Sequence, residues 1–333
     1  MKRRAFLLSS LLAACAPVVQ KPRLPVAGFR GARFEGDRFI SFDGAALGLT
    51  VWEAEYEPQA VIVGLHGMND YANAFHMAAP WWAGQGITTY AFDQRGFGRS
   101  PHRGLWGGQA LMCEDLRTCV ELVRERHPGV PVAVVGESMG GAVAIAAFAS
   151  NRPPRADRLV LLAPAVWGWS SQPLPNRTAL WFTAHLAGSK VIKPPRWVTQ
   201  HIRASDNIDE LRAMGRDPLM IWGARSDALW GLTHLMETAW ASTGRLRVPT
   251  AYLYGANDEI IPREPTLQAA ARLPDPDRTA LYRNGWHLLL RDRQAQTVWK
   301  DVAAFTFDPH ARLPSGAPPI PRAPIASTRV SGL

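Results

Sequence analysis

One ten-residue stretch constrains the fold of this chain more than any other. It runs from Val132 to Gly141 and reads VAVVGESMGG, an apolar run that ends in Gly-x-Ser-x-Gly. Small apolar residues follow it up to Ala149, as in a closely packed helix. The pattern predicts a buried strand, a sharp turn centred on Ser138 and then a helix, with Gly136 and Gly140 at positions where a Cβ would collide with neighbouring backbone.

A turn of this kind is a nucleophile elbow. It lifts the Ser138 hydroxyl out of the sheet and places it at a helix N-terminus, where free N–H groups and the helix dipole favour developing negative charge. The alternative is an ordinary strand-to-helix turn in which Ser138 only caps the helix. The rest of the chain has to decide between these two interpretations.

Five further apolar runs have the length of buried strands, and helical patterns separate most of them. The runs are 60–65, 88–92, 159–163, 250–254 and 279–282. A repeated order of strand, loop and helix predicts an α/β protein with a mostly parallel central sheet flanked by helices. We expect residues 38–163 and 249–307 to form this core.

The pattern breaks between 164 and 248, which predicts an inserted helical cap. This segment has no apolar run of the strand type, and it carries seven of the thirteen tryptophans. Most of these tryptophans are expected in the core of the cap itself. An aromatic, Met-rich underside would nevertheless suit an acyl chain.

Two more polar residues follow predicted strands: Asp258 after 250–254, and His287 after 279–282. Because the carboxyl ends of parallel strands share one edge of the sheet, both residues can meet Ser138 there. A serine needs a base to take its proton, a histidine can do so near neutral pH, and a carboxylate holds that histidine in the correct tautomer. The sequence therefore predicts a catalytic triad of Ser138, Asp258 and His287, with Glu259 as the one close rival for the acid.

With this order of serine, acid and histidine, the chain resembles the α/β-hydrolase superfamily, in the group of monoacylglycerol lipases, lysophospholipases and serine aminopeptidase-like hydrolases. The resemblance spans roughly Ala60 to Phe305. Its motifs are His66-Gly67, the loop from Asp93 to Ser100, Gly136 to Gly141, Asp258, His287, and Asp217-Pro218-Leu219 as the opening of a cap helix. It implies an α/β-hydrolase fold and the hydrolysis, through an acyl-enzyme, of an ester that carries one acyl chain.

The resemblance also implies roles for loop residues. The loop that begins at His66 resembles one that supplies an oxyanion donor, so the N–H groups of Met68 and Met139 are implied to bind the oxyanion. His66 itself is expected to be a packed, hydrogen-bonded side chain. Asp93 and Arg95 are expected to pair or hydrogen-bond within their loop rather than to take part in catalysis.

The start of the chain predicts export. Lys2-Arg3-Arg4 precedes a short apolar stretch, Ala5 to Ala14, which is too short to span a bilayer. Leu12-Ala13-Ala14-Cys15 resembles a bacterial lipobox, which implies that Cys15 is acylated and becomes the mature N-terminus; Arg3-Arg4 also resembles a twin-arginine signal. We therefore expect a signal peptide over 1–15, a tether over 16–37, and a lipoprotein anchored on the periplasmic side of the bacterial cell envelope.

Composition limits the classes of partner that this protein is expected to bind. The net charge of +9 comes from scattered Lys and Arg, without a nucleic-acid-binding motif, so nucleic acid is not expected as a partner. A solvated basic surface and an affinity for anionic membranes both stay open. The Pro-rich and Ser-rich segment 308–333 is expected to be a disordered tail.

The remaining candidate groups predict little further chemistry. The chain contains neither His-Glu-x-x-His nor Cys-x-x-Cys, so we predict no metal site and no cofactor. Cys113 and Cys119 lie six apart on one predicted helix and point in different directions, which argues against a disulfide. Glu137 is expected to be buried structural support.

The leading hypothesis is a membrane-tethered serine esterase whose substrate is a small amphiphilic ester, a monoacylglycerol or a lysophospholipid. A second hypothesis keeps the mechanism but gives it a short-chain ester, a peptide or another non-lipid substrate. A third is a non-catalytic envelope lipoprotein that uses the fold as a binding scaffold, since a fold alone does not guarantee activity.

Overall fold

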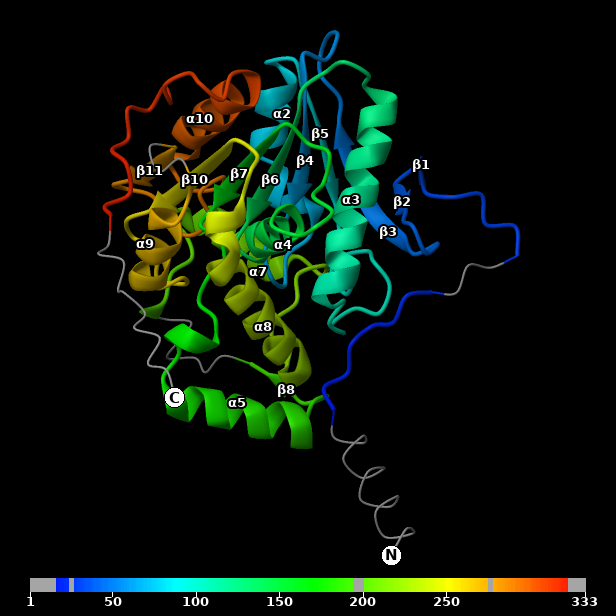
Figure 1. Cartoon of the computed structure of the whole chain (residues 1–333), viewed down its shortest axis with the longest axis vertical. Coiled ribbons are helices and arrows are strands. Elements are labelled where there is room, and N and C mark those ends of the chain that lie inside the picture. The colour runs from blue at the N-terminus through cyan, green and yellow to red at the C-terminus, as the bar shows by residue number, and fades with distance from the viewer. Residues whose placement is uncertain (1–15, 24–26, 194–200, 275–277, 323–333) are drawn as a thin grey trace, which may run out of the picture.

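Apolar runs rich in valine and leucine form the centre of a nine-stranded sheet (Figure 1). The computed structural model describes residues 16–23, 27–193, 201–274 and 278–322. The predicted signal peptide, with Cys15, lies outside the described residues. The strands are β1 (Arg33–Glu35), β2 (Arg38–Ile40), β3 (Ala46–Trp52), β4 (Ala60–Leu65), β5 (Ile87–Phe92), β6 (Val132–Glu137), β7 (Arg158–Leu162), β10 (Thr250–Gly255) and β11 (Thr279–Tyr282).

The strand order is β1-β2-β3-β5-β4-β6-β7-β10-β11. The strands β5, β4, β6, β7, β10 and β11 pair in parallel, whereas β1, β2 and β3 are antiparallel to their neighbours. The prediction of a mostly parallel central sheet is therefore confirmed. All the parallel strands end at one edge, and this edge receives Ser138, Asp258 and His287.

Helices cover both faces of the sheet (Figure 1). They are η1 (Ala72–Phe75), α2 (Ala78–Ala83), α3 (Gln109–Arg126), α4 (Met139–Phe148), α9 (Arg263–Ala271) and α10 (Ala295–Phe307). Alternate residues of β6 explain how the two cores form: Val132 and Val134 join the core under α3 and α4, and Ala133 and Val135 join the core under α2 and α10. Cys113 and Cys119 are buried free thiols, as expected.

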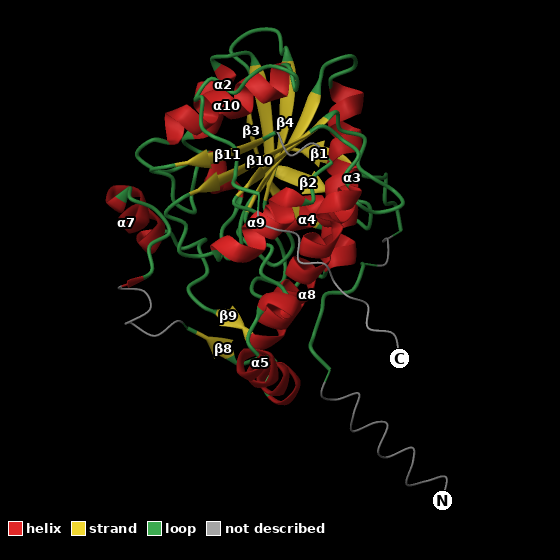
Figure 2. Cartoon of the chain, turned by 60° about the vertical axis from the view of Figure 1, so that its left-hand side comes forward, coloured by secondary structure: helices red, strands yellow, loops and turns green. Residues whose placement is uncertain are grey.

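The segment between β7 and β10 forms a cap at the carboxyl edge (Figure 2). It contains η2 (Trp169–Ser171), α5 (Leu174–Leu186), β8 (Val191–Ile192), α7 (Ile208–Arg216), β9 (Ala224–Arg225), α8 (Ser226–Ser242) and η3 (Thr243–Arg245). One prediction is wrong here, because Asp217 follows the last residue of α7 and does not open a helix. Instead its carboxylate accepts a 2.6 Å hydrogen bond from Tyr71, which ties the cap to the loop after β4.

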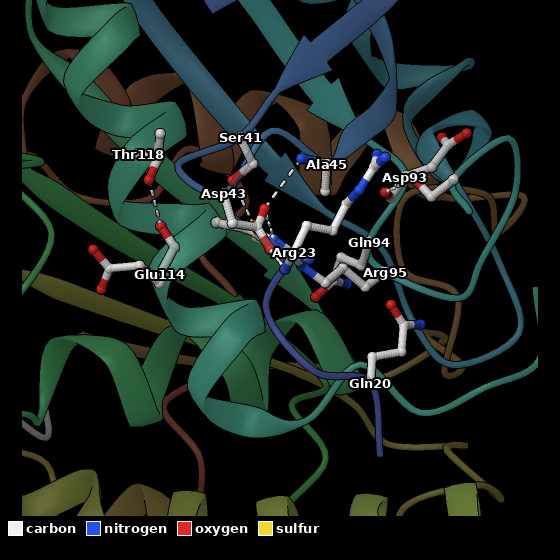
Figure 3. Close-up of polar contacts among 12 residues, drawn as sticks. Gln20, Arg23, Ser41, Asp43, Ala45, Asp93, Gln94, Arg95, Glu114 and Thr118 are labelled. Atoms are coloured by element: carbon white, nitrogen blue, oxygen red, sulfur yellow. Dashed lines mark hydrogen bonds and ion pairs between the residues drawn. The ribbon is translucent and has the colours of Figure 1, made fainter. Parts of the chain in front are cut away.

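The described part of the predicted tether is not a free linker. The Gln20 backbone N–H donates to the Trp106 carbonyl at 2.9 Å, and the Gln20 side chain donates to the Leu105 carbonyl at 2.8 Å. The Arg23 N–H donates to Asp43 at 2.9 Å (Figure 3). Further along the segment, β1 pairs with β2. We call residues Ala16–Arg23 the strap, because hydrogen bonds at Gln20 and Arg23 fix this segment to the domain.

The described part of the predicted disordered tail is likewise ordered. Ile320 is buried, and its N–H donates to Thr279 Oγ1 at 2.9 Å. The Leu281 N–H of β11 donates to the Pro318 carbonyl at 2.8 Å. The prediction of disorder is therefore wrong for residues 308–322, since this segment covers the otherwise open edge of the sheet.

The loop from Asp93 to Ser100 joins the strap to the core through buried ion pairs (Figure 3). Asp93 bonds within the loop, where it accepts from Arg99 at 2.9 Å. The expectation was wrong for Arg95, whose guanidinium instead leaves the loop to pair with Asp43 at 2.8 Å and Asp115 at 2.7 Å. Asp43 also accepts the Arg23 N–H, so the same buried cluster holds the strap.

None of the helices in the described part of the chain combines the length and the apolarity needed to cross a membrane.

Candidate active site

Ser138 occupies a strained turn between β6 and α4. Its backbone has φ 52° and ψ −116°, in the left-handed range that residues with a Cβ rarely adopt. A Cβ on Gly136 would lie 2.7 Å from the Gly140 carbonyl oxygen, and one on Gly140 would collide with the Leu65 carbonyl of β4. Ser138 makes no side-chain cap hydrogen bond to α4, which argues against a simple capping role.

The loop after β4 lies directly against this turn. A Cβ on Gly67 would be 3.3 Å from the Ser138 Cβ. His66 shapes the loop: its Nε2 accepts from the Gln94 N–H at 2.8 Å, so its Nδ1 must carry the proton that is donated to the Gly67 carbonyl at 2.7 Å. Burial lowers the pKa of His66, in keeping with this neutral form. His66 is therefore a packed structural residue, as expected.

Two backbone amides were expected to bind an oxyanion, one next to Ser138 in the chain and one from the loop after β4. Met139 is the first residue of α4, and Met68 follows Gly67 and lines the same cavity as Ser138. Neither N–H donates a hydrogen bond to another described residue. Two free donors beside a serine hydroxyl are what an oxyanion hole requires, although their catalytic role stays a prediction.

His287 and Asp258 are hydrogen-bonded to one another. The His287 Nδ1–H donates to Asp258 Oδ2 at 2.9 Å, and Asp258 Oδ1 accepts the N–H groups of Ile260 and Ile261 at 2.8 and 2.9 Å. The rival acid Glu259 is exposed and accepts from the Arg203 N–H instead. The structure therefore brings Asp258, and not Glu259, to the histidine.

The electrostatic surroundings favour a charged His287. Burial by itself would lower the pKa of His287, but the charge and hydrogen bond of Asp258, with a smaller contribution from the charge of Glu137, outweigh burial and raise it. No hydrogen bond joins the Ser138 hydroxyl to the His287 ring in the described part of the chain. Such bonds are often long before substrate binds and shorten afterwards.

Ser138 and His287 line one cavity of about 810 Å³, within the size range of ligand sites. Gly67, Met68 and Glu137 lie on the same wall. The rest of the lining is mostly apolar: Ile192, Ile202, Leu211, Met214, Met220, Ile221, Trp222, Leu229, Ile260 and Leu288. Two smaller cavities, of about 250 and 310 Å³, contain none of the predicted site residues.

A buried ionic cluster next to Ser138 was not predicted from the sequence. Arg291 Nη1 lies 2.7 Å from Asp70, and Nη2 lies 2.8 Å from Glu137, with all three side chains almost fully buried in the cavity wall. Arg291 Nε and Glu137 Oε1 are buried, and neither has a hydrogen-bond partner among the described residues. Desolvation raises the pKa of Glu137 despite the charge of Arg291, which opposes the rise.

Asp292 braces the segment that carries His287. It accepts from the Trp286 N–H and from Ser205 Oγ, both at 2.7 Å. Burial raises the pKa of Asp292 to about 7. A short sequence clue for Arg291 and Asp292 existed: two charged residues follow an apolar run, Leu288 to Leu290, directly after the predicted catalytic histidine.

A strained serine at a strand-to-helix turn and a histidine–aspartate pair, all at the carboxyl edge of a mostly parallel sheet, define the chain as an α/β-hydrolase fold. Comparison with known proteins agrees. A sequence profile described as "Serine aminopeptidase, S33" matches residues 56–294, and the chain belongs to this family.

Curated relatives span nearly the same length. The monoacylglycerol lipase of Mycolicibacterium smegmatis is 25% identical over 291 residues, covering 80% of this chain and 95% of the relative. The monoglyceride lipase of Mus musculus is 24% identical over 286 residues, covering 84% and 93% of the two chains.

Solved structures share the fold. The monoacylglycerol lipase of Paleococcus ferrophilus superposes with a TM-score of 0.63 at 20% identity, covering 79% of this chain and 99% of that one. A soluble variant of the monoglyceride lipase of Saccharomyces cerevisiae, in complex with a substrate analog, gives a TM-score of 0.68 at 17% identity, covering 89% and 100%.

Proposed function

We propose that this protein is a serine hydrolase that releases a fatty acid from esters with a single acyl chain, such as a monoacylglycerol or a lysophospholipid. The observation that carries the proposal is the cavity in which Ser138 and His287 adjoin a long apolar lining. The names of the relatives from Mycolicibacterium smegmatis and Mus musculus support monoacylglycerol as the first substrate to test.

In this mechanism His287 Nε2 takes the proton of Ser138 Oγ as the oxygen attacks the ester carbonyl carbon. The N–H groups of Met68 and Met139 hold the negative oxygen of the tetrahedral intermediate. His287 then gives the proton to the departing alcohol, which leaves the acyl group on Ser138. A water molecule, deprotonated by His287, attacks this acyl-enzyme and releases the fatty acid, while Asp258 keeps the imidazole oriented throughout.

The lining of the cavity accounts for the choice of substrate. An acyl chain gains about 0.8 kcal/mol per methylene that leaves water, and the apolar side chains of the cap and the His287 segment provide that environment. The cluster of Asp70, Glu137 and Arg291 forms a polar part of the same wall. A cavity that is polar beside the serine and apolar elsewhere suits a molecule with a polar head and one tail.

The signal at the start of the chain supports a second part of the proposal. We expect Cys15 to be acylated after export, which would anchor the enzyme in a membrane of the bacterial cell envelope. Mass spectrometry of the N-terminal peptide tests this part directly. An unmodified Cys15, or cleavage elsewhere, would remove the anchor without affecting the hydrolase assignment.

Neighbouring acids provide a matched test of the triad. Asp258→Asn should lower kcat with monodecanoylglycerol by roughly 10³–10⁴, and Ser138→Ala should abolish fatty-acid release and labelling by a fluorophosphonate probe. Glu259→Gln, one residue from Asp258, should retain nearly full activity because its carboxylate contacts Arg203 instead. Equal losses in Asp258→Asn and Glu259→Gln, or unchanged release by Ser138→Ala, would refute the triad.

An acyl chain-length series tests the substrate class. The proposal predicts that kcat/KM for p-nitrophenyl esters rises from acetyl to decanoyl, because the longer chain reaches more of the apolar lining. A preference for acetyl would favour a short-chain esterase with the same mechanism.

A further inference from the structure

Exposed apolar side chains concentrate on the cap. Nine of the fourteen large hydrophobic residues that are exposed in the described chain belong to it: Leu174, Trp181, Phe182, Leu186, Val191, Ile192, Ile202, Ile208 and Trp222. Two more, Val18 and Val19, belong to the strap. Contiguous exposed apolar surface on a soluble domain marks an interaction site.

Helix α5 presents most of this surface. It lies at the end of the molecule, farthest from the sheet (Figure 2). Among its thirteen residues only Ala184 is buried. Leu174, Trp181 and Phe182 recur at i, i+7 and i+8 and so share one face, on which they are 69%, 45% and 55% exposed. This apolar face has no partner within the described chain.

The cavity opens onto the same surface. Ile192, Ile202, Trp222 and Ile260 are at once exposed to solvent and part of the cavity lining. They join the exposed apolar residues of the cap to the wall that leads to Ser138. We call α5, β8 and the exposed parts of these four residues the cap face.

Basic residues outnumber acidic ones in the sequence around α5 and β8; the exposed Glu259, next to Ile260, accepts from the Arg203 N–H. The sequence contains no Asp or Glu between Asp157 and Asp206, whereas the described part of this stretch that belongs to the cap contains Arg177, Lys190, Lys193 and Arg203. Lys190 and Lys193 flank β8 within the cap face. Apolar side chains combined with an excess of basic ones match a membrane surface that carries anionic lipid.

The strap brings the start of the chain to the same side. Gln20 is bonded to Leu105 and Trp106, and the Trp106 ring packs against Gly231 of α8. On the preceding residue of α8, the Trp230 ring is 4.9 Å from the His185 ring of α5. Both views of the molecule place the described end of the strap beside α5 and α8 (Figures 1 and 2).

We propose that the cap face is a membrane-docking surface for bilayers that carry anionic phospholipid, and that the strap turns this face toward the membrane. Gln20 is the first fixed residue after Cys15, so a lipid on Cys15 could lie at most about 17 Å from it along an extended chain. The anchored domain is therefore held with its cavity mouth against the bilayer. The orientation rests on the acylation of Cys15 proposed above, but the docking surface does not.

Vesicle binding tests the surface. Full-chain protein with Cys15→Ser should cosediment with phosphatidylcholine vesicles that contain phosphatidylglycerol, and less with pure phosphatidylcholine. Trp181→Asp combined with Phe182→Asp should weaken this binding at least about ten-fold, because two large side chains no longer leave water. Leu174→Asp should act in the same direction, since an acid in the first turn preserves the helix.

Tyr56→Asp is the matched control. Tyr56 is 49% exposed, close to the 45% of Trp181, but it lies before β4, at the amino edge of the parallel strands. It should leave vesicle binding unchanged. All variants should hydrolyse soluble p-nitrophenyl butyrate at the parent rate, which shows that they are folded. Equal binding by the parent and the cap variants would overturn the docking surface, as would loss of vesicle binding in favour of a concentration-dependent dimer.

Quenching by nitroxide head-group lipids tests the orientation in the acylated protein. A fluorophore on Thr178→Cys of α5 should be strongly quenched, and one on Glu57→Cys, at the opposite end, should not; the native Cys113 and Cys119 are buried. Equal quenching at both positions would overturn the orientation. Because binding and quenching do not depend on turnover, a protein that docks but fails to hydrolyse esters would refute the proposed function and leave this inference standing.

Discussion

Arg291→Met would leave two buried carboxylates without the guanidinium that pairs with them. Arg291 lies 2.7 Å from Asp70 and 2.8 Å from Glu137, and its side chain is 1% exposed. Methionine fills a similar length of the same site without a charge. The substitution therefore tests the ionic contacts more than the packing.

The expected cost follows from the desolvation of the remaining charges. Removing one partner of a buried ion pair typically costs about 3–5 kcal/mol. Glu137, whose pKa is already raised by burial, can take up a proton and escape part of this cost. We therefore expect a loss of about 3 kcal/mol near neutral pH, at the lower end of that range.

The loss should depend on pH in one direction. Without Arg291, the pKa of Glu137, which burial already raises, rises further above its unfolded value, so the folded state binds more protons than the unfolded state. Stability then falls as pH rises through that window. The cost of Arg291→Met should consequently be larger near pH 8 than near pH 5.

Urea unfolding followed by circular dichroism measures this cost, and Arg155→Met is the matched control. Arg155 pairs with Glu121 at 3.3 Å, but the two side chains are 76% and 42% exposed; its loss should stay within about 1 kcal/mol. Adding Asp70→Asn and Glu137→Gln to Arg291→Met should recover most of the stability. Equal losses in Arg291→Met and Arg155→Met, with no dependence on pH, would refute the role given to the cluster.

Four further substitutions, one of them a control outside the cavity, test other features of the structure. Glu137→Gln removes a charge that raises the pKa of His287; because His287 must be neutral to accept the Ser138 proton, the acid limb of the kcat/KM profile should move to lower pH, and a shift to higher pH would contradict the assignment. Gly140→Ala should abolish soluble expression, since its Cβ would collide with the Leu65 carbonyl, whereas Gly215→Ala in α7, with open space around it, should stabilise by up to about 1 kcal/mol in thermal unfolding. Asp292→Asn should raise stability near pH 8 but not near pH 4. The pKa of Asp292 is about 7 in the folded protein against 3.8 in the unfolded chain, so ionisation of Asp292 costs the native protein stability as pH rises between these two values. Equal effects of the substitution at both pH values would argue against a protonated Asp292.

The features that the sequence could predict are those with a local pattern. Apolar runs of strand length, separated by helical periodicity, were sufficient for the mostly parallel sheet. Ser138, Asp258 and His287 could be selected because each lies in the turn or loop that follows such a run, and a parallel sheet gathers strand ends at one edge. The geometry of the His287–Asp258 pair agrees with that selection, and the catalytic roles stay predictions.

The features that could not be predicted depend on contacts between distant segments. Arg291 and Glu137 are 154 positions apart, and Arg95 and Asp43 are 52 apart; a charged residue in a loop gives no sign of its partner. Low apolar content made residues 16–23 and 308–322 resemble free linkers. Their order comes from a few backbone hydrogen bonds, as at Gln20 and Ile320, to which composition is insensitive.

The position of the cap explains how membrane docking would lower the barrier to substrate entry. The cap is inserted between β7 and β10, so it covers the edge at which Ser138 lies, and a substrate has to pass it. An acyl chain of about fifteen methylenes that crossed water on this route would meet a barrier on the order of 12 kcal/mol at 0.8 kcal/mol per methylene. A cavity mouth lined by Ile192 and Trp222 and pressed against the bilayer lets the chain move from one apolar environment to another. The same geometry predicts that Trp181→Asp with Phe182→Asp slows hydrolysis of monoacylglycerol in anionic vesicles but not of a soluble butyrate ester, because only the first substrate has to leave a membrane.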